Sequence, residues 1–135
     1  MLRARQRIGK YRILGRIASG PLADVYSAFD TIQNIKVALK LPTQDERTGQ
    51  EEILHEVRVA TKLQHPNILS VLNASFIEEH FVIAMELGEE SLADRLARRM
   101  STARALDLAQ QALAGLAYAH EHRIIHCDIK PENYI

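Results

Sequence analysis

The chain has 135 residues, 25% of them charged, and its formal net charge is zero. This length corresponds to one domain and is sufficient to bury a hydrophobic core. The balanced charge does not favour nucleic acid, and no apolar run approaches the roughly 18 residues that a membrane helix needs. The single cysteine, Cys127, has no partner for an intrachain disulfide, which fits a reducing compartment. We therefore expect a cytoplasmic protein that binds neither nucleic acid nor membrane through this segment.

The N-terminus is basic, and residues 1–10 are assigned to a basic N-terminal arm. The cations that precede the first acidic residue, Asp24, are Arg3, Arg5, Arg7, Lys10, Arg12 and Arg16. A run of this kind can bind a partner, or it can be the solvated edge of a first strand.

Extended segments dominate the first part of the chain. The Gly20–Pro21 pair marks a turn between the first two segments, and Pro42 ends the third. A helix is expected across about 49–64, because apolar residues recur there at helical spacing. The expected strands lie at 10–17, 25–29, 35–41, 68–75 and 81–87. The pattern predicts an antiparallel sheet of five strands with one inserted helix.

From Ser91 onward the spacing of apolar residues becomes helical. Residues 91–99 favour a short helix, and a long one follows at about 101–122, capped by Ser101 or Thr102. A short extended piece at 123–125 leads into the final loop. The apolar face of the long helix is formed by Leu106, Ala109, Leu113, Leu116 and Ala117. Strands followed by a helical half are typical of an α+β fold.

The turn after the first strand is a weak candidate for phosphate binding. Glycine permits backbone N–H groups to approach phosphate oxygens closely. Only Gly20 lies at this turn, and its neighbour Pro21 has no N–H to offer. A plain hairpin turn remains the alternative.

Lys40 is a second candidate, in the sequence "VALK". It alternates with Val37 and Leu39, so it lies on the other face of its strand and needs a counter-charge. Glu56, on the expected helix, can hold this ammonium ready for a phosphate. The alternative is an exposed ion pair worth about 0–1 kcal/mol.

The tail, "HCDIKPENYI", carries the strongest signal. Asp128 can accept a hydroxyl proton, Lys130 can neutralise phosphate charge, and the Asn133 carbonyl can bind a metal. Pro131 prevents a helix through this segment. A merely polar loop is the alternative.

A cluster of imidazole and thiol groups nearby suggests zinc as a rival interpretation. Its members are His120, His122, His126, Cys127 and Asp128. Their spacing matches none of the standard zinc patterns. A nucleophilic Cys–His pair is also disfavoured, because adjacent residues rarely orient their side chains toward each other.

In this order, the segments resemble the N-terminal half of the catalytic domain of eukaryotic-type serine/threonine protein kinases. "VALK" resembles the strand that carries the lysine, and "LHEVRVATKLQHPNIL" resembles the helix that pairs with it. "FVIAMELGEESLADRL" resembles the next strand, the hinge and a helix, and "HEHRIIHCDIKPEN" resembles the catalytic loop. The resemblance runs from about Tyr11 to Ile135. It implies a kinase N-lobe at 11–87, followed at 88–135 by the hinge, two helices and the catalytic loop of a truncated C-lobe.

This resemblance implies transfer of the γ-phosphoryl group of ATP, with Mg²⁺, to a serine or threonine of a protein. Asp128 then accepts the substrate proton, Lys130 steadies the phosphoryl group, and Asn133 binds Mg²⁺. Lys40, paired with Glu56, contacts the α- and β-phosphates. The other positions expected around the nucleotide are Ala18, Gly20, Val25, Ala38, Met85, Glu86 and Gly88. Among these, Val25 and Ala38 enclose the adenine, Met85 is the gatekeeper, and Glu86 to Gly88 form the hinge.

The chain departs from the family pattern in three ways. The glycine loop has alanine at two of its three glycine positions, Ala18 and Ala23, which stiffens the loop and crowds the phosphates. Cys127 replaces the usual arginine, which implies control without the activation-loop contact. The 135 residues contain no Asp–Phe–Gly motif.

We therefore expect a truncated domain that is inactive alone. We also expect a C-terminal half or a partner chain to cover its long helix. A non-catalytic kinase-like module that binds nucleotide or another protein is the alternative.

Overall fold

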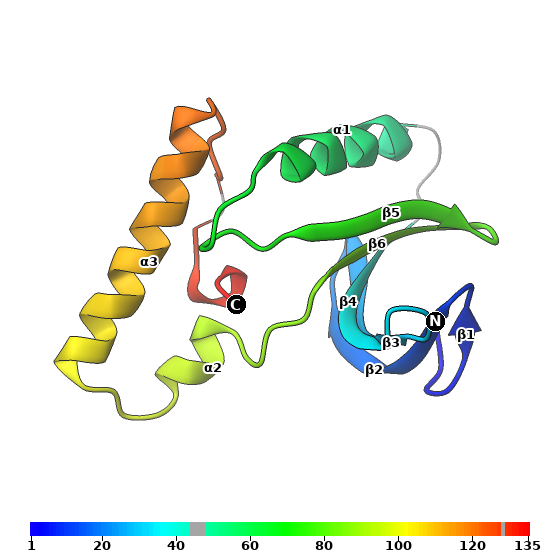
Figure 1. Cartoon of the computed structure of the whole chain (residues 1–135), viewed down its shortest axis with the longest axis horizontal. Helices are drawn as coiled ribbons and strands as arrows, with labels where there is room; N and C mark the ends of the chain where they lie inside the picture. The colour runs from blue at the N-terminus through cyan, green and yellow to red at the C-terminus, as the bar shows by residue number, and fades with distance from the viewer. Residues whose placement is uncertain (44–47, 128) are drawn as a thin grey trace. The chain divides into compact units, whose positions relative to one another are not determined.

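A computed structural model describes residues 1–43, 48–127 and 129–135 of the chain (Figure 1). The strands are β1 (Arg7–Ile8), β2 (Tyr11–Ser19), β3 (Ala23–Asp30), β4 (Ile35–Pro42), β5 (Val71–Ile77) and β6 (His80–Glu86). The helices are α1 (Thr48–Lys62), α2 (Leu92–Leu96), α3 (Thr102–Glu121) and the 3-10 turn η1 (Pro131–Asn133). The chain forms two compact units. Unit 1 comprises 1–62 and 70–87, and unit 2 comprises 63–69 and 88–135.

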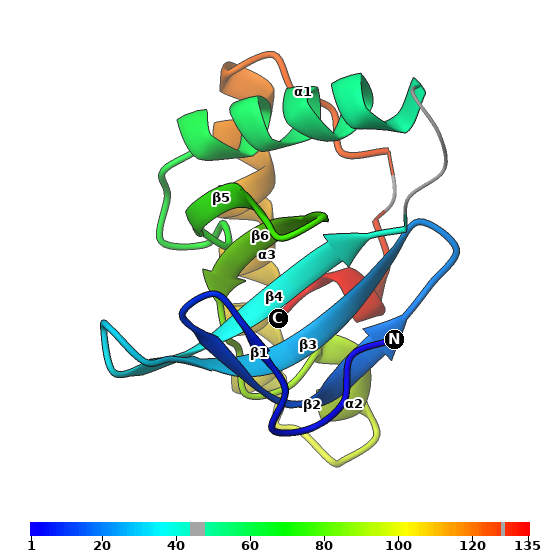
Figure 2. The ribbon, with the colours of Figure 1, turned by 90° about the vertical axis from the view of Figure 1, so that its right-hand side faces the viewer.

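The sheet of unit 1 is antiparallel and has six strands within the described residues, in the order β1-β2-β3-β4-β6-β5 (Figure 2). The five strands predicted from the sequence are present as β2 to β6, and the sheet has one strand more. The additional strand, β1, comes from the basic arm, and its two residues pair with Arg12 and Tyr11 of β2. Backbone hydrogen bonds from Arg5 N to Ile13 O and from Ile13 N to Gln6 O, both 2.8 Å, hold the arm there.

Alternation along the strands creates the core of unit 1. On β4, Val37 and Leu39 are buried on the face that also receives Tyr26 and Ala28 of β3. The side chains face alternate sides as the sequence predicted, although Ala38, between them on the other face, is buried as well. Leu2, from the arm, packs against the same cluster, and its N–H donates to the Tyr26 hydroxyl at 3.2 Å.

A buried carboxylate organises the turn between β3 and β4. The Asp30 carboxylate accepts from the N–H groups of Ile32 and Gln33, both at 2.9 Å. It also forms an ion pair with Lys10 Nζ at 2.6 Å. The left-handed conformation of Asn34, with φ of 61°, completes the turn into β4.

Helix α1 contacts β5 and presents a half-buried apolar stripe that includes Ile53 and Val57. It begins at Thr48 and ends at Lys62, close to the predicted range of 49–64. None of the described helices has both the length and the apolar character that crossing a membrane would require.

In unit 2, α3 buries small residues rather than its leucines. Gly115 and Ala119 are the buried positions of the helix, while Leu106 and Leu113 are exposed. A side chain at position 115 would lie 2.6 Å from the Asn67 carbonyl oxygen, so glycine permits the 63–69 segment to approach. The segment 123–125, predicted to be a short extended piece, begins within the turn that follows α3, where Arg123 has φ of 60°.

Candidate functional site

The ion pair predicted from the sequence is present in unit 1. Lys40 Nζ lies 2.7 Å from Glu56 Oε1, joining β4 to α1. The Lys40 side chain is 29% exposed and that of Glu56 is 61% exposed. A pair this accessible adds little to stability, because water solvates both charges nearly as well. It does fix the position of the ammonium group.

Strand register places several predicted nucleotide positions beside this lysine. Val25 is the direct cross-strand partner of Lys40, and Ala18 is in turn the partner of Val25. Direct partners in an antiparallel sheet project from the same face. Ala38 lies two residues before Lys40 on that face, opposite Met85 of β6. The structure therefore places Ala18, Val25, Ala38, Lys40 and Met85 on one face of the sheet, where Ala38 is buried.

The hairpin between β2 and β3 holds Gly20 at its tip. Its N–H donates to the Ala23 carbonyl at 3.0 Å, and Ser19 Oγ donates to Asp24 Oδ1 at 2.6 Å. Thr43, just after β4, donates through its N–H to Leu22 O at 2.9 Å and through its hydroxyl to Pro21 O at 2.8 Å. Sequence reasoning missed Thr43, because no local pattern reveals a bond to a loop about twenty residues away.

Of the hinge positions, Glu86 is the last residue of β6 and Gly88 lies two residues beyond it. The Glu86 N–H donates to Ser70 O at 3.3 Å, which holds the end of the strand within unit 1. In unit 2, Gly88 lies against Ile135, and any side chain at position 88 would collide with the isoleucine. The pattern "MELG" does not signal this close approach.

The final loop places Lys130 and Asn133 in one turn of unit 2. Lys130 is extended and precedes η1, and the Asn133 N–H donates to its carbonyl oxygen at 3.0 Å. Pro131 is the first residue of η1, where its missing N–H costs nothing. The third residue predicted here, Asp128, lies outside the described residues.

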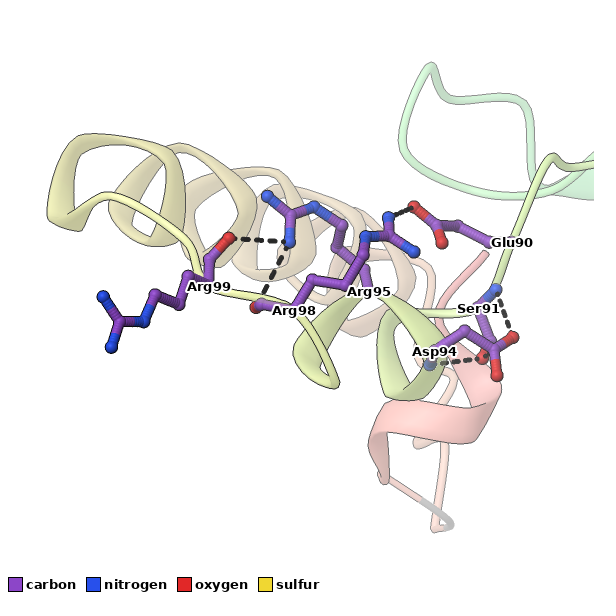
Figure 3. Close-up of polar contacts among 6 residues, drawn as sticks. All are labelled: Glu90, Ser91, Asp94, Arg95, Arg98 and Arg99. Atoms are coloured by element: carbon purple, nitrogen blue, oxygen red, sulfur yellow. Dashed lines mark hydrogen bonds and ion pairs between the residues drawn. The ribbon is translucent and has the colours of Figure 1, made fainter.

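The final loop is attached to the start of α2. Ser91 and Asp94 form a reciprocal capping box, with Asp94 N donating to Ser91 Oγ at 3.1 Å and Ser91 N donating to Asp94 Oδ2 at 3.3 Å (Figure 3). Leu92 is the first residue of α2, and its N–H donates to Tyr134 O at 2.7 Å. Beside this cap, the hydrogen bond from Arg98 holds the pKa of Glu90 below its ordinary value.

The histidines and the cysteine do not combine into a metal site in the part of the chain that the structure describes. No three His, Cys, Asp or Glu side chains gather there to hold an ion. His122 Nδ1 is hydrogen bonded to Tyr118 O at 2.8 Å, and its ring lies 4.2 Å from that of Tyr118. Cys127 is exposed in a left-handed conformation, with φ of 66°, and its Sγ donates to Ile125 O at 3.6 Å.

Comparison with known proteins agrees with this arrangement. Residues 11–135 match the family model described as "Protein kinase domain". Serine/threonine-protein kinase PrkC of Bacillus subtilis is 33% identical over 141 residues, covering 100% of this chain and 22% of that protein. Serine/threonine-protein kinase pkn2 of Myxococcus xanthus is 35% identical, covering 93% of this chain and 16% of that protein. The chain thus spans less than a quarter of the length of these relatives.

Solved structures show the same fold. The kinase domain of Mycobacterium tuberculosis PknI superposes with a TM-score of 0.75 at 23% identity, covering 98% of this chain and 56% of that one. The curled antiparallel sheet with its helix is therefore a kinase N-lobe, followed in the chain by helices of the C-lobe. On the family match over residues 11–135, the chain belongs to the protein kinase domain family, and the curated relatives named above are serine/threonine kinases.

Proposed function

We propose that the chain is the nucleotide-binding part of a serine/threonine protein kinase that transfers the γ-phosphoryl group of ATP to a protein hydroxyl. The observation that carries this proposal is the 2.7 Å Lys40–Glu56 ion pair, on the face of β4 that also carries Ala38. A lysine held by a carboxylate on a neighbouring helix is positioned to contact phosphate oxygens before a ligand arrives. The proposed segments are 1–10 as arm, 11–87 as N-lobe and 88–135 as the start of the C-lobe.

The same face suits the rest of a nucleotide. Val25, opposite Lys40, and Ala38, two residues before it, are apolar side chains on the face of the lysine, so we assign them to the adenine by the resemblance to protein kinases. Met85 is half-buried beside Ala38, as a gatekeeper would be, and Glu86 to Gly88 supply the hinge backbone. Ala18 and Gly20 belong to the loop assigned to the phosphates.

The catalytic loop supplies the chemistry in this proposal. Asp128 orients the substrate hydroxyl and accepts its proton, and Lys130 offsets charge on the transferring group. The Asn133 side-chain carbonyl is an oxygen ligand suited to Mg²⁺, which when bound neutralises phosphate charge.

Asn133 alone would bind Mg²⁺ weakly, because Mg²⁺ usually relies on a carboxylate as well as neutral oxygen ligands. The 135 residues contain no Asp–Phe–Gly sequence to provide one. We therefore propose that this polypeptide has no turnover by itself, and that a C-terminal half or partner chain covers α3.

Titration calorimetry with ATP tests the nucleotide site. Lys40→Met is expected to weaken binding about ten-fold or more, because the phosphates lose their fixed cation. Lys62→Met, at the exposed end of α1, is the matched control and should leave affinity unchanged. Equal affinity in wild type and Lys40→Met would contradict the proposal.

The hairpin tip favours a second candidate, a non-catalytic module that binds nucleotide weakly. At this tip the Gly20 N–H is already bonded to Ala23 O, and Pro21 has no N–H, so neither residue offers a free backbone donor to a phosphate. Thr43 holds the same tip through two hydrogen bonds. Affinity for ATP that does not change when Mg²⁺ is removed would favour the module over the kinase.

A further inference from the structure

A row of cations crosses the sheet of unit 1 outside the proposed nucleotide positions. Strand register aligns Arg7 of β1, Arg12 of β2, Phe29 of β3 and Lys36 of β4 as successive direct partners. Direct partners project from one face, so these four side chains, here called the basic row, lie side by side. The three cations are exposed and Phe29 is half-buried.

The row brings like charges together without acidic compensation. Arg7 and Arg12 are directly opposed, an arrangement that destabilises a sheet through repulsion. Among the described residues, the salt bridges involve other side chains, and no carboxylate lies within 4.0 Å of these three cations. Arg7 donates instead to the Thr31 hydroxyl at 3.5 Å, and the Arg12 guanidinium lies 5.4 Å from the centre of the Phe29 ring.

The fold also holds the arm firmly in this unfavourable position. Arg5, two residues before Arg7, adopts φ of 69°, which is uncommon for a residue other than glycine. Its N–H nevertheless forms a 2.8 Å bond to Ile13 O, and the Arg3 N–H donates to Gln6 Oε1 at 3.1 Å. These bonds, together with the packing of Leu2 and Ile8 against the core, fix the positions of the cations before a ligand binds.

We infer that the basic row docks a short, extended acidic peptide whose carboxylates lie on alternate residues. Neighbouring strands are about 4.8 Å apart, so the row spans about 14 Å from Arg7 to Lys36. Alternate side chains of an extended peptide are separated by about 7 Å, so three of them cover the same distance. Guanidinium groups bind carboxylates through two parallel hydrogen bonds, which suits Arg7 and Arg12 in particular.

The short span of the basic row and the zero net charge of the chain favour a peptide over a larger polyanion. The chain has no net charge, so it lacks the long-range field that draws nucleic acid to a protein. Within the row, the apolar side chain is the half-buried Phe29, beside the Arg12 guanidinium, so it is poorly placed to enter a bilayer. The inference does not depend on phosphoryl transfer, because the row uses none of the residues assigned to ATP or to the catalytic loop.

Fluorescence anisotropy with a labelled Glu-Ser-Glu-Ser-Glu peptide tests the inference without nucleotide. Arg7→Gln/Arg12→Gln is expected to weaken binding about ten-fold, and Lys36→Gln, at the other end of the row, about three-fold. The control Arg58→Gln/Arg99→Gln removes two exposed cations elsewhere and should leave binding unchanged. Removing the opposed arginines relieves repulsion, so the melting temperature at low salt should not fall.

Two further probes distinguish the peptide from other anions. A peptide with Gln in place of Glu should not bind. Single-stranded oligonucleotide and phosphatidylserine vesicles should bind more weakly than the acidic peptide. The inference is overturned if the acidic peptide fails to bind, or if the control variant loses as much affinity as the row variants. Tighter binding of oligonucleotide or vesicles through the same arginines would also overturn it.

Discussion

The carboxylate of Asp30 connects three parts of unit 1 that are separate in the sequence. It caps the β3–β4 turn through two backbone N–H groups and pairs with Lys10, which lies between β1 and β2. Burial alone would raise its pKa, but the hydrogen bonds from Lys10, Gln33 and Ile32 outweigh that effect and hold the pKa below the ordinary value of 3.8. The hydrogen bond to Asp30 raises the pKa of Lys10 in turn.

Asp30→Asn should lower the free energy of unfolding by about 1–3 kcal/mol at pH 7, because buried donors lose a charged acceptor. A lowered pKa stabilises the fold above the ordinary carboxyl value, and this contribution disappears as pH falls through the folded-state pKa. The wild type should therefore lose stability more steeply than Asp30→Asn below about pH 4. Thermal melts between pH 2 and 7 check this, and parallel curves for the two proteins would contradict it.

A substitution at Glu56 can distinguish an effect on stability from an effect on nucleotide binding. Glu56→Gln should change the free energy of unfolding by less than about 1 kcal/mol, because the Lys40–Glu56 pair is accessible to water. ATP affinity should nevertheless fall, since the ammonium loses the partner that fixes it. Denaturant melts and nucleotide titration measure the two effects. Glu52→Gln on the same helix is the control for charge alone, and an equal loss of affinity in both variants would refute the assignment.

At the scale of elements, the sequence predicted what depends on local pattern. The alternation of "IKVALKL" predicted β4, and Ser101 or Thr102 was the predicted cap of α3. The cap is Ser101, whose side chain accepts from Arg104 N at 3.1 Å. Bonds between distant segments left no such signal. Strand β1 exists because Arg5 and Gln6 pair with Ile13, and its two residues are too few to show a period.

At the candidate site, too, the sequence predicted the features that depend on a local motif and missed those that depend on contacts between distant segments. Lys40 and Glu56 were predictable because each belongs to a motif with a fixed partner. The hydrogen bonds of Thr43 to the hairpin tip were not predictable, because they depend on how β4 ends. The burial of α3 through Gly115 and Ala119 was also hidden, since its leucines suggested a different inner face.

Gly115→Ala tests the packing of α3 on the 63–69 segment. Alanine normally stabilises a helix interior by about 1 kcal/mol relative to glycine. Here the new methyl group would lie 2.6 Å from the Asn67 carbonyl oxygen, so the expected result is a lower melting temperature. Ala114→Ser, at the adjacent exposed position, should be nearly neutral. A stabilised Gly115→Ala protein would show that the segment does not pack closely on the helix.

The capping box of α2 is the second element that can be tested. Ser91→Ala removes the acceptor of the Asp94 N–H and should destabilise the helix start by about 1 kcal/mol. Because Tyr134 O binds the N–H of Leu92, loss of the cap should also loosen the final loop. Hydrogen exchange at Leu92 should therefore become faster. Ser91→Asp preserves a capping oxygen, so its Leu92 amide should be protected from exchange as well as in the wild type. Unchanged protection of Leu92 in Ser91→Ala would show that the cap does not hold the final loop.

At the scale of the molecule, apolar surface remains on α3. Leu106 is 61% exposed and Leu113 is 65% exposed, and the small exposed residues Ala109 and Ala117 lie near them on the helix. Contiguous apolar surface of this kind marks an interface or causes aggregation. The chain corresponds to 56% of the solved PknI kinase domain. We therefore expect the isolated 135 residues to self-associate through α3 when nothing else covers it.

Leu106→Glu/Leu113→Glu should suppress that self-association and leave the melting temperature nearly unchanged. Both side chains are exposed, so their replacement removes little buried area, and surface changes usually alter stability by no more than about 0.5 kcal/mol. Sedimentation velocity over a range of protein concentrations measures the effect. The matched control, Leu22→Glu/Ile32→Glu, adds the same charge at two exposed turns of unit 1 and should not reduce association. Equal suppression by both pairs would attribute the effect to net charge, and persistent association in the α3 variant would place the contact on another surface.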